Sequence, residues 1–348
     1  MKKTNTLIPI LAEYFSSYLP DTKGVSQNTI TSYEYAFALL FEYINDHKGV
    51  PPEKVSFETL SEGILLEYLN WLETARGCSP TTRNLRRTAI SSFAKYAMKK
   101  NLSEALVLCS SISNIPRKRV QKNSEIKYLT KEEIGILLAL PNGTSKIDKR
   151  NAVLLSFLYA SGARAQELCD LTVNDVHFGG ETNIRLMGKG KKPRLVTIPD
   201  NCAVLLKNYL RSIHLDPKNP NDRHKHVFSS QTHEQMSISC VEEIVKKYVN
   251  IAKSAHPHLF GRSYSPHSFR HSIAVHMLES GESLVVIKAF LGHASIATTA
   301  VYASVTPELA NKYLRERGKI IPASEMEQQD KADKIVAALP FLRRVGKK

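Results

Sequence analysis

The segment Pro-His-Ser-Phe-Arg-His-Ser, residues 266–272, decides how this chain is interpreted. Leu-Gly-His follows at residues 291–293, Tyr302 lies nine residues after that histidine, and Ser-Gly-Ala-Arg-Ala-Gln-Glu-Leu lies upstream at residues 161–168. Arginines bind phosphate oxygens, histidines donate hydrogen bonds or move protons, and a tyrosine can attack phosphorus. Together these residues predict that a nucleic-acid strand is broken and rejoined through a covalent phosphotyrosine, without a metal ion.

The two arginines are the expected phosphate ligands. Arg270 comes three residues after His267 near a predicted helix start, and Arg164 follows a glycine turn at another helix start. Backbone N–H groups at a helix N-terminus favour an anion, and two guanidinium groups supply paired donors to the non-bridging oxygens. Glu167, on the same helical face as Arg164, is expected to orient that arginine.

The remaining roles follow from what a phosphate transfer needs. Tyr302 is the expected nucleophile, and because a free phenol has a pKa near 10, it needs a base and a positive field, which His267 and the arginines can provide. Lys189, in the turn Gly-Lys-Gly-Lys-Lys-Pro, is the candidate general acid for the departing 5′ oxygen. His293 is expected to hydrogen-bond the phosphate in the transition state.

Each of these residues also has an ordinary structural explanation. Any one of the 14 tyrosines can be a packing residue, Lys191 and Lys192 share the turn of Lys189, and His271 and His276 can be structural histidines. The sequence has no HExxH motif, and the paired histidines at 256–258 have no carboxylate beside them, so no metal and no cofactor are expected.

Charge and composition favour a nucleic-acid partner. The chain has 348 residues, 42% of them hydrophobic, and 48 Lys plus Arg against 33 Asp plus Glu, which gives a formal net charge of +15. Such an excess is typical of proteins that neutralise phosphates. Five scattered cysteines fit reduced thiols in a cytoplasmic protein, and we expect neither a signal peptide nor a membrane span.

The first hundred residues have helical periodicity. Apolar spacing predicts helices from Ser26, over Leu60–Leu72, and from Ser79-Pro80 onward. The last of these is apolar on one side and rich in arginine and lysine on the other, which suits either a DNA backbone or a solvated surface. Residues 113–127 are polar and basic with little periodicity and are interpreted as a linker.

The second half mixes helices with two short strands. A capping-box pattern at Thr130 predicts a helix through Leu140, and the strands are expected at Asn183–Met187 and Arg194–Ile198. Further helices are predicted at Asn151–Leu158, Arg164–Leu171, Ala203–Ile213, Cys240–Ala252, Ser268–Ser280 and Leu284–Leu291, with a short amphipathic segment at Ile335–Leu342.

These motifs, in this order and spacing, resemble the tyrosine recombinases of the phage integrase family. The matching pieces are Arg164, Lys189, His267, Arg270, His293 and Tyr302, each within its motif; Ala163 departs from the commoner Leu or Met before the first arginine. The resemblance implies a mainly α fold, a two-domain C-shaped clamp on duplex DNA with a small antiparallel sheet in the catalytic domain. Its implied parts are a core-binding domain at 1–112, the linker at 113–127, a catalytic domain at 128–320 and a tail at 321–348.

The resemblance also implies a reaction and leaves its biological role open. A homotetramer on two synapsed sites would exchange strands through 3′-phosphotyrosyl bonds, with neither ATP nor metal. A mobile-element integrase or transposase is favoured by the sequence around 271–281 and 297–303. The alternatives are an Xer-type chromosome-dimer resolvase, a type IB topoisomerase and, in a different class, a non-catalytic DNA-binding accessory protein.

Overall fold

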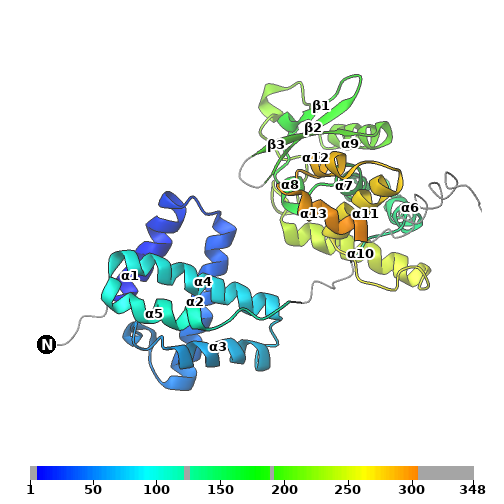
Figure 1. Cartoon of the computed structure of the whole chain (residues 1–348). Helices are drawn as coiled ribbons and strands as arrows, with labels where there is room; N and C mark the ends of the chain where they lie inside the picture. The colour runs from blue at the N-terminus through cyan, green and yellow to red at the C-terminus, as the bar shows by residue number, and fades with distance from the viewer. Residues whose placement is uncertain (1–5, 121–125, 189–191, 305–348) are drawn as a thin grey trace, which may run out of the picture. The chain divides into compact units, whose positions relative to one another are not determined.

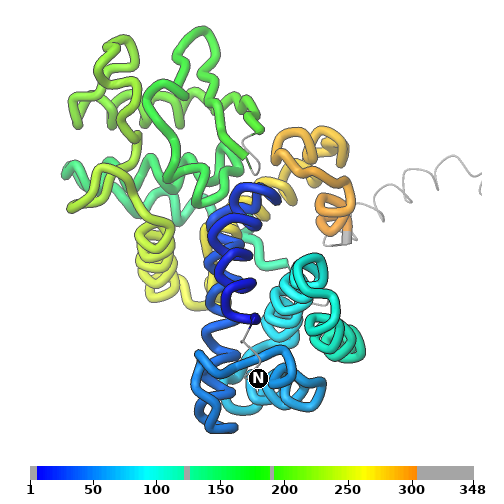
Figure 2. Tube along the Cα trace, turned by 90° about the vertical axis from the view of Figure 1, so that its left-hand side faces the viewer, coloured from blue at the N-terminus to red at the C-terminus, as the bar shows by residue number. Residues whose placement is uncertain are grey.

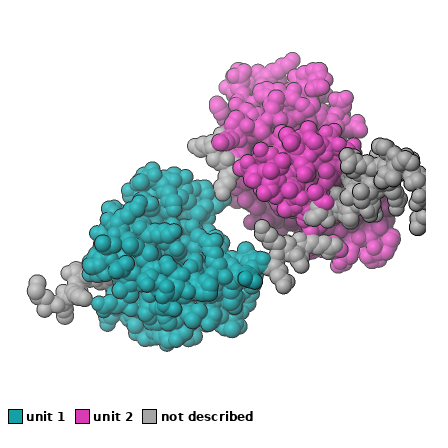
Figure 3. All heavy atoms as spheres, viewed as in Figure 1, with its two compact units in different colours: residues 1–124 teal, residues 125–348 magenta. Residues whose placement is uncertain are grey.

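The computed structural model describes residues 6–120, 126–188 and 192–304 of the chain. The described residues are mainly helical, with one small sheet (Figure 1). They divide into two compact units, Met1–Ser124 and Glu125–Lys348, which are coloured separately in Figure 3. Each unit buries a hydrophobic core of its own, so each is described by itself.

Every described element of unit 1 is a helix. The helices are α1 (Leu7–Glu13), the π-helix η1 (Tyr14–Thr22), α2 (Gln27–Lys48), η2 (Pro52–Lys54), α3 (Glu62–Thr74), α4 (Pro80–Lys100) and α5 (Leu102–Asn114). The predicted start of α4 is confirmed, because Pro80 is its first residue and the Ser79 side chain accepts a hydrogen bond from the Thr82 backbone N–H. Ser26 occupies the N-cap position of α2, but its side chain makes no capping hydrogen bond there.

The arginines of α4 are used inside unit 1, which the sequence did not show. Arg83 is only 2% exposed, and all three arginines donate to backbone carbonyl oxygens. Their acceptors are Pro116 for Arg83, Ser32 for Arg86, and both Ile112 and Ile115 for Arg87. These arginine side chains therefore stabilise unit 1. The basic side chains of α4 that are exposed to solvent are the lysines nearer its C-terminal end.

Residues 115–118, which directly follow α5, lie along α4 and are called the docked segment. Asn84 donates to the carbonyl oxygen of Lys118 at 2.8 Å and accepts from its backbone N–H at 3.0 Å. Arg87 donates to the carbonyl oxygen of Ile115 at 2.6 Å, and the ammonium of Lys118 pairs with Glu73 at 2.6 Å. The docked segment is thus part of the packed structure of unit 1.

Unit 2 carries the sheet and the remaining helices. Its elements are α6 (Lys131–Ala139), α7 (Lys146–Ser161), α8 (Ala165–Cys169), η3 (Val173–Asp175), β1 (Val176–His177), β2 (Thr182–Met187), β3 (Pro193–Ile198), α9 (Asp200–Ser212), η4 (Pro220–Asp222), α10 (Ile238–Ala255), α11 (Pro266–Glu279), α12 (Leu284–Leu291), α13 (Ile296–Ala300) and η5 (Val301–Ser304). The capping box at Thr130 is confirmed, with hydrogen bonds in both directions between Thr130 and Glu133.

The sheet is antiparallel in the order β1-β2-β3. Strands β2 and β3 lie where the sequence placed them, and β1 is an additional strand that two residues are too few to reveal by alternation. Met187 pairs with Pro193 at the turn end of the β2–β3 hairpin, and Ile184 and Leu186 point into the core. The helix predicted over Arg164–Leu171 is shorter than expected, because α8 ends at Cys169.

Helix α7 is the centre of unit 2. It packs against α6, α9, α11 and β3, and it ends where the candidate site begins. Helix α12 and the short helix η5 pack against α11, and α13 packs against α12 and η5; Figure 2 shows these last described elements in orange. Within the described ranges no single helix has the length and hydropathy to cross a membrane, although one bent pair, Leu284–Leu291 with Ile296–Ala303, passes that test by length and composition.

Candidate active site

The turn after α7 is shaped by Gly162. This residue has a positive φ of 56°, and a Cβ there would lie 3.0 Å from Cδ2 of Leu291 and 3.1 Å from Cε1 of Phe290. The Ser161 hydroxyl accepts from the Ala163 backbone N–H at 3.2 Å and closes the turn. Glycine is required both for the left-handed backbone and for the close approach. The turn places Arg164 directly before α8.

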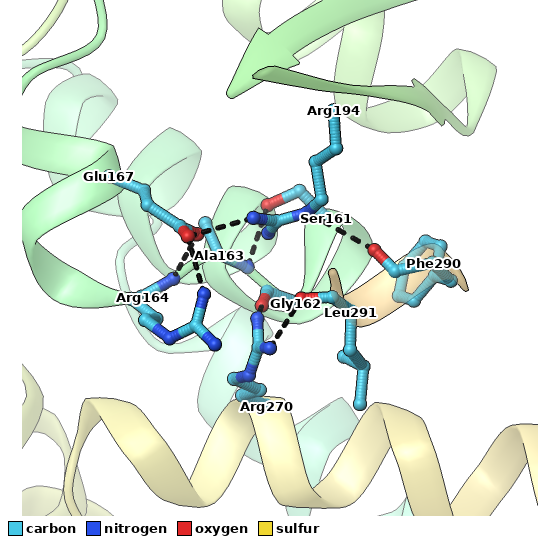
Figure 4. Close-up of polar contacts among 9 residues, drawn as sticks. All are labelled: Ser161, Gly162, Ala163, Arg164, Glu167, Arg194, Arg270, Phe290 and Leu291. Carbon is cyan, nitrogen blue, oxygen red and sulfur yellow. Dashed lines mark hydrogen bonds and ion pairs between the residues drawn. The ribbon is translucent and has the colours of Figure 1, made fainter. Parts of the chain in front are cut away.

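Glu167 holds two arginines together. Its carboxylate accepts from the Arg164 backbone N–H at 2.9 Å, from the Arg164 side chain at 2.7 Å and from the Arg194 side chain at 2.8 Å (Figure 4). The Glu167 side chain is 3% exposed, Arg194 is 10% exposed and Arg164 is 36% exposed. Arg194 also donates to the carbonyl oxygen of Phe290 at 3.1 Å, so it joins β3, α8 and α12.

The ionisation of Glu167 reflects these contacts. Burial alone would raise the pKa of Glu167, but the hydrogen bonds and charge of Arg194 and the hydrogen bonds of Arg164 outweigh it and lower the pKa. The carboxylate is therefore charged at neutral pH. Of the three side chains in this ion-pair network, that of Arg164 is the most exposed.

Arg270 is fully buried and fastens two segments to α11. Its terminal nitrogens donate to the carbonyl oxygens of Gly162 and Leu291, both at 2.5 Å (Figure 4). Burial, followed by the nearby charges of Arg164 and Arg194, lowers the pKa of Arg270 to about 9. That value is still well above 7, so the guanidinium is charged at neutral pH. Its Nε is buried and has no hydrogen-bond partner among the described residues.

His293 follows the glycine that ends α12. Gly292 has a positive φ of 64°, and a Cβ there would meet the Arg194 side chain at 3.0 Å. His293 Nδ1 lies 2.9 Å from the Thr299 hydroxyl, which fixes the ring. Burial, followed by the cations Arg270 and Arg164, lowers the pKa of His293 to about 4. The imidazole is thus neutral at pH 7.

Tyr302 lies in η5 and is only 2% exposed. Its hydroxyl lies 3.0 Å from Nδ1 of His271, and its ring stacks at 6.4 Å on His293. Burial raises the pKa of Tyr302, while the charges of Arg270 and Arg164 oppose that rise. The nucleophile predicted from the sequence therefore lies within the field of both predicted phosphate ligands.

His271 is the residue that the sequence reasoning undervalued. The sequence predicted His267 as the group beside Tyr302, whereas the described hydrogen bond of the Tyr302 hydroxyl is to His271. The His267 and His271 rings are 4.4 Å apart. Their spacing of four residues, about one helical turn, was the available signal. It did not separate His271 from His276, five residues further along the same helix, because either could be a structural histidine.

His267 is the second residue of α11 and is exposed. Removal of solvent from part of the ring, followed by the charges of Arg270 and Arg164, lowers its pKa. The structure thus brings together five of the six predicted site residues, because the charges of two of them affect the pKa of the other three. The two are Arg164 and Arg270, and the three are His267, His293 and Tyr302.

Lys189 lies outside the described residues, and so does Lys191. Their neighbour Gly188 is described, and its backbone N–H donates to the carbonyl oxygen of Lys192 at 2.9 Å. A Cβ on Gly188 would lie 3.9 Å from Oε1 of Glu167, so this end of β2 borders the arginine cluster.

The cluster carries a net positive charge. Three guanidinium groups, from Arg164, Arg194 and Arg270, face one carboxylate, from Glu167, which leaves 3 − 1 = +2 with the histidines neutral. The buried Arg194 Nη2 and Arg270 Nε have no hydrogen-bond partner among the described residues. Within the same ranges no group of three or more His, Cys, Asp or Glu side chains is arranged to hold a metal ion. The arginine cluster, with its net positive charge, suits the binding of a phosphate anion.

Known proteins are similar to this chain over most of its length. Residues 127–308 match the phage integrase family, and residues 12–101 match the phage integrase N-terminal SAM-like domain. An integrase/recombinase of Sinorhizobium fredii, y4rC, is 30% identical over 306 residues, covering 88% of this chain and 90% of that protein. The tyrosine recombinase XerD of Pseudomonas putida is 29% identical over 297 residues, covering 85% and 92%.

A solved structure shares the fold. The XerH site-specific recombinase, described in a post-cleavage complex with a palindromic difH substrate, aligns with a TM-score of 0.64 at 24% identity, over 90% of each chain. By class, these matches place the chain among the recombinases. Within that class it belongs to the phage integrase family, the tyrosine recombinases.

Proposed function

We propose that this protein cuts and rejoins duplex DNA at specific sites through a 3′-phosphotyrosyl bond to Tyr302. The observation that carries the proposal is the position of Tyr302, which is buried and lies in the electrostatic field of Arg164 and Arg270, two members of a cluster of net charge +2. A phenol in such a field is directed toward a phosphate and stabilised as it loses its proton.

The proposed chemistry assigns each candidate a role. Arg164 and Arg270 bind the non-bridging oxygens of the scissile phosphate, and His267 and His293 donate hydrogen bonds as charge develops on them. Lys189 donates a proton to the departing 5′ oxygen. The energy of the broken phosphodiester stays in the phosphotyrosine, so strand rejoining needs neither ATP nor a metal ion.

The partner that fits this chemistry is double-stranded DNA. The net charge of +15 supports binding along many phosphates. We propose a core-binding domain at 1–112, a linker at 113–127 whose residues 113–118 pack against unit 1 as the end of α5 and the docked segment, a catalytic domain at 128–320 and a tail at 321–348 that contacts a neighbouring protomer. Strand exchange between two sites then requires a homotetramer or an assembly with related protomers.

The biological role that we favour is integration, excision or transposition of a mobile element. The S. fredii relative bears the name integrase/recombinase, which supports this choice. The XerD relatives support an Xer-type chromosome-dimer resolvase as the second candidate. Recombination of DNA that flanks the gene itself, rather than of a chromosomal resolution site, distinguishes the two. Because either substrate is cellular DNA, we propose action in the cytoplasm, at the nucleoid.

Replacement of Tyr302 by Phe tests the chemistry. With a nicked suicide substrate, the wild type should form a covalent protein–DNA adduct that survives denaturing electrophoresis. Tyr302→Phe should bind the same DNA normally and form no adduct. An adduct in the variant would move the nucleophile to another tyrosine, with Tyr313 the next one to replace. Absence of an adduct in both proteins, with normal DNA binding, would favour the non-catalytic accessory role.

A further inference from the structure

His271 makes the contact with Tyr302 that the proposed reaction leaves unexplained. It lies on α11, and its Nδ1 is 3.0 Å from the Tyr302 hydroxyl oxygen. We propose that His271 is a further catalytic residue, which accepts the phenolic proton of Tyr302 as the tyrosine attacks phosphorus. This inference rests on the proposed function.

The surroundings of Tyr302 favour a proton acceptor from the protein over bulk water. The residue is 2% exposed and packs in a small core with Val275, Ile287 and Leu291. Bulk water therefore has little access to the phenol. Within the described ranges, His271 is the hydrogen-bond partner of the hydroxyl, whereas His267 touches the ring of His271 and not the phenol.

The charge state of His271 suits an acceptor. The groups that face it are His267 and Arg270 on α11, His293 beyond α12, and Tyr302 in η5. Burial first, and then the charges of His267, Arg270 and His293, lower its pKa to about 4, so the ring is neutral at pH 7. A neutral imidazole with its proton on Nε2 has a free lone pair on Nδ1 that can accept from the phenol.

A bound phosphate would make His271 a stronger base. The cationic field that lowers its pKa includes Arg270, and a phosphate on Arg164 and Arg270 adds negative charge beside the same groups. Protonation of His271 then becomes easier only when the scissile phosphate is in place. The tyrosine is thus activated with substrate and held neutral without it.

The step balances as follows. The Tyr302 oxygen forms a bond to phosphorus, and its proton moves to His271 Nδ1. The bond from phosphorus to the 5′ oxygen breaks, and that oxygen takes a proton from the general acid, Lys189 in the proposed mechanism. In the rejoining step the incoming 5′ hydroxyl gives its proton to the now neutral Lys189 and its oxygen bonds to phosphorus. The bond from phosphorus to Tyr302 breaks, and His271 returns its proton to the departing phenolate.

The chain contains a matched histidine–tyrosine pair, in which His276 lies on α11, like His271, and Tyr159 lies on α7. His276 Nδ1 lies 2.9 Å from the Tyr159 hydroxyl, and burial, followed by the charge of Lys131, lowers the pKa of His276 to about 4. The pair has the geometry of His271 and Tyr302 but faces no arginine of the site. Replacement of His276 therefore measures the purely structural cost of losing such a pair.

The test compares His271→Ala, His271→Gln and His276→Ala by adduct formation on nicked substrates. One substrate carries the normal 5′ oxygen, and the other a 5′-bridging phosphorothiolate, whose thiolate leaves without a proton. His271→Ala should bind DNA normally but form the adduct roughly 100-fold more slowly on both substrates, as expected for loss of a general base. Added imidazole should raise the rate of adduct formation by His271→Ala at least about tenfold, and more basic imidazoles should raise it further.

Glutamine separates proton transfer from position. His271→Gln can hold the phenol by a hydrogen bond but cannot take its proton, so it should stay slow, and it decides the case if the alanine variant fails to fold. His276→Ala should cleave at the wild-type rate per folded molecule. Three outcomes would overturn the role of His271 but leave Tyr302 as the nucleophile. They are a wild-type rate of adduct formation in His271→Gln, a rate in His271→Ala above that of the wild type, and a slow His271→Ala that imidazole does not rescue. A wild type that forms no adduct at Tyr302 would refute both proposals.

Discussion

Replacement of Glu167 by Gln should destabilise unit 2 strongly. The change keeps the shape of the side chain but removes the negative charge between Arg164 and Arg194, and the local net charge rises from +2 to +3. Breaking a buried ion pair on one side costs about 3–5 kcal/mol. Because Arg164 is 36% exposed, solvent screens its part, and the loss rests mainly on Arg194 at 10% exposure. We therefore expect the lower end, about 3 kcal/mol.

Urea denaturation can separate this effect from the rest of the chain. Trp71 is the single tryptophan and lies in α3, so its fluorescence follows unit 1, whereas the helical circular dichroism signal follows both units. With an m-value of roughly 3 kcal/mol per molar urea, the unit 2 transition should move down by about 1 M. The fluorescence transition of the same sample should not move.

The pH dependence of unit 2 stability tests whether the Glu167 carboxylate is buried and charged. The folded-state pKa of Glu167 is lowered, so its stabilising effect is fully present above the unfolded value, about 4.3, and is lost as pH falls through the folded value. The difference between wild type and Glu167→Gln should be constant from pH 7 to about 5 and shrink below about 4.3. An unchanged unit 2 transition at pH 7, or an equal loss at every pH, would refute the assignment of a buried, charged carboxylate.

Three further outcomes are expected. Gly162→Ala should lower the stability of unit 2 by about 2–4 kcal/mol in the same urea assay, since the new methyl group meets Leu291 and the backbone has a positive φ; a neutral result would contradict the described turn. Lys189→Ala should cleave the normal substrate slowly, and its cleavage rate should recover on the 5′-bridging phosphorothiolate substrate, whereas the rate of Arg164→Ala should not recover. If Lys191→Ala shows the slow cleavage and the recovery expected of Lys189→Ala, the assignment of Lys189 as the general acid is wrong. Cleavage should continue in excess EDTA, because guanidinium groups carry the phosphate charge, and activity lost in EDTA but restored by magnesium or zinc would contradict the mechanism.

Elements that begin with a chemical signal were predictable from the sequence. Ser79-Pro80 and Thr130 mark helix starts through caps that depend on local bonds, and the structure has both. Elements without such a signal were not. Strand β1 has two residues and cannot show alternation, and the π-helix η1 contains Pro20, which sequence rules treat as a helix breaker.

The contacts of side chains were less predictable than their types. The periodicity of α4 showed one basic side, but not that its arginines bind carbonyl oxygens of other segments, because those acceptors arrive through tertiary packing. His267 and His271 share one face of α11, and the position of η5 decides which of them meets Tyr302. That position depends on contacts with Val275 and Ile287, which are distant in sequence.

The docked segment has a consequence for chimaeric recombinases. A graft of unit 1 onto a foreign catalytic unit is most simply cut at the end of α5, after Asn114. Such a cut removes the carbonyl acceptor that Ile115 offers to Arg87 and both hydrogen bonds of Asn84 to Lys118. A crossover placed after Lys118 transfers the segment together with the helix that holds it, so the exchanged module keeps its own surface intact.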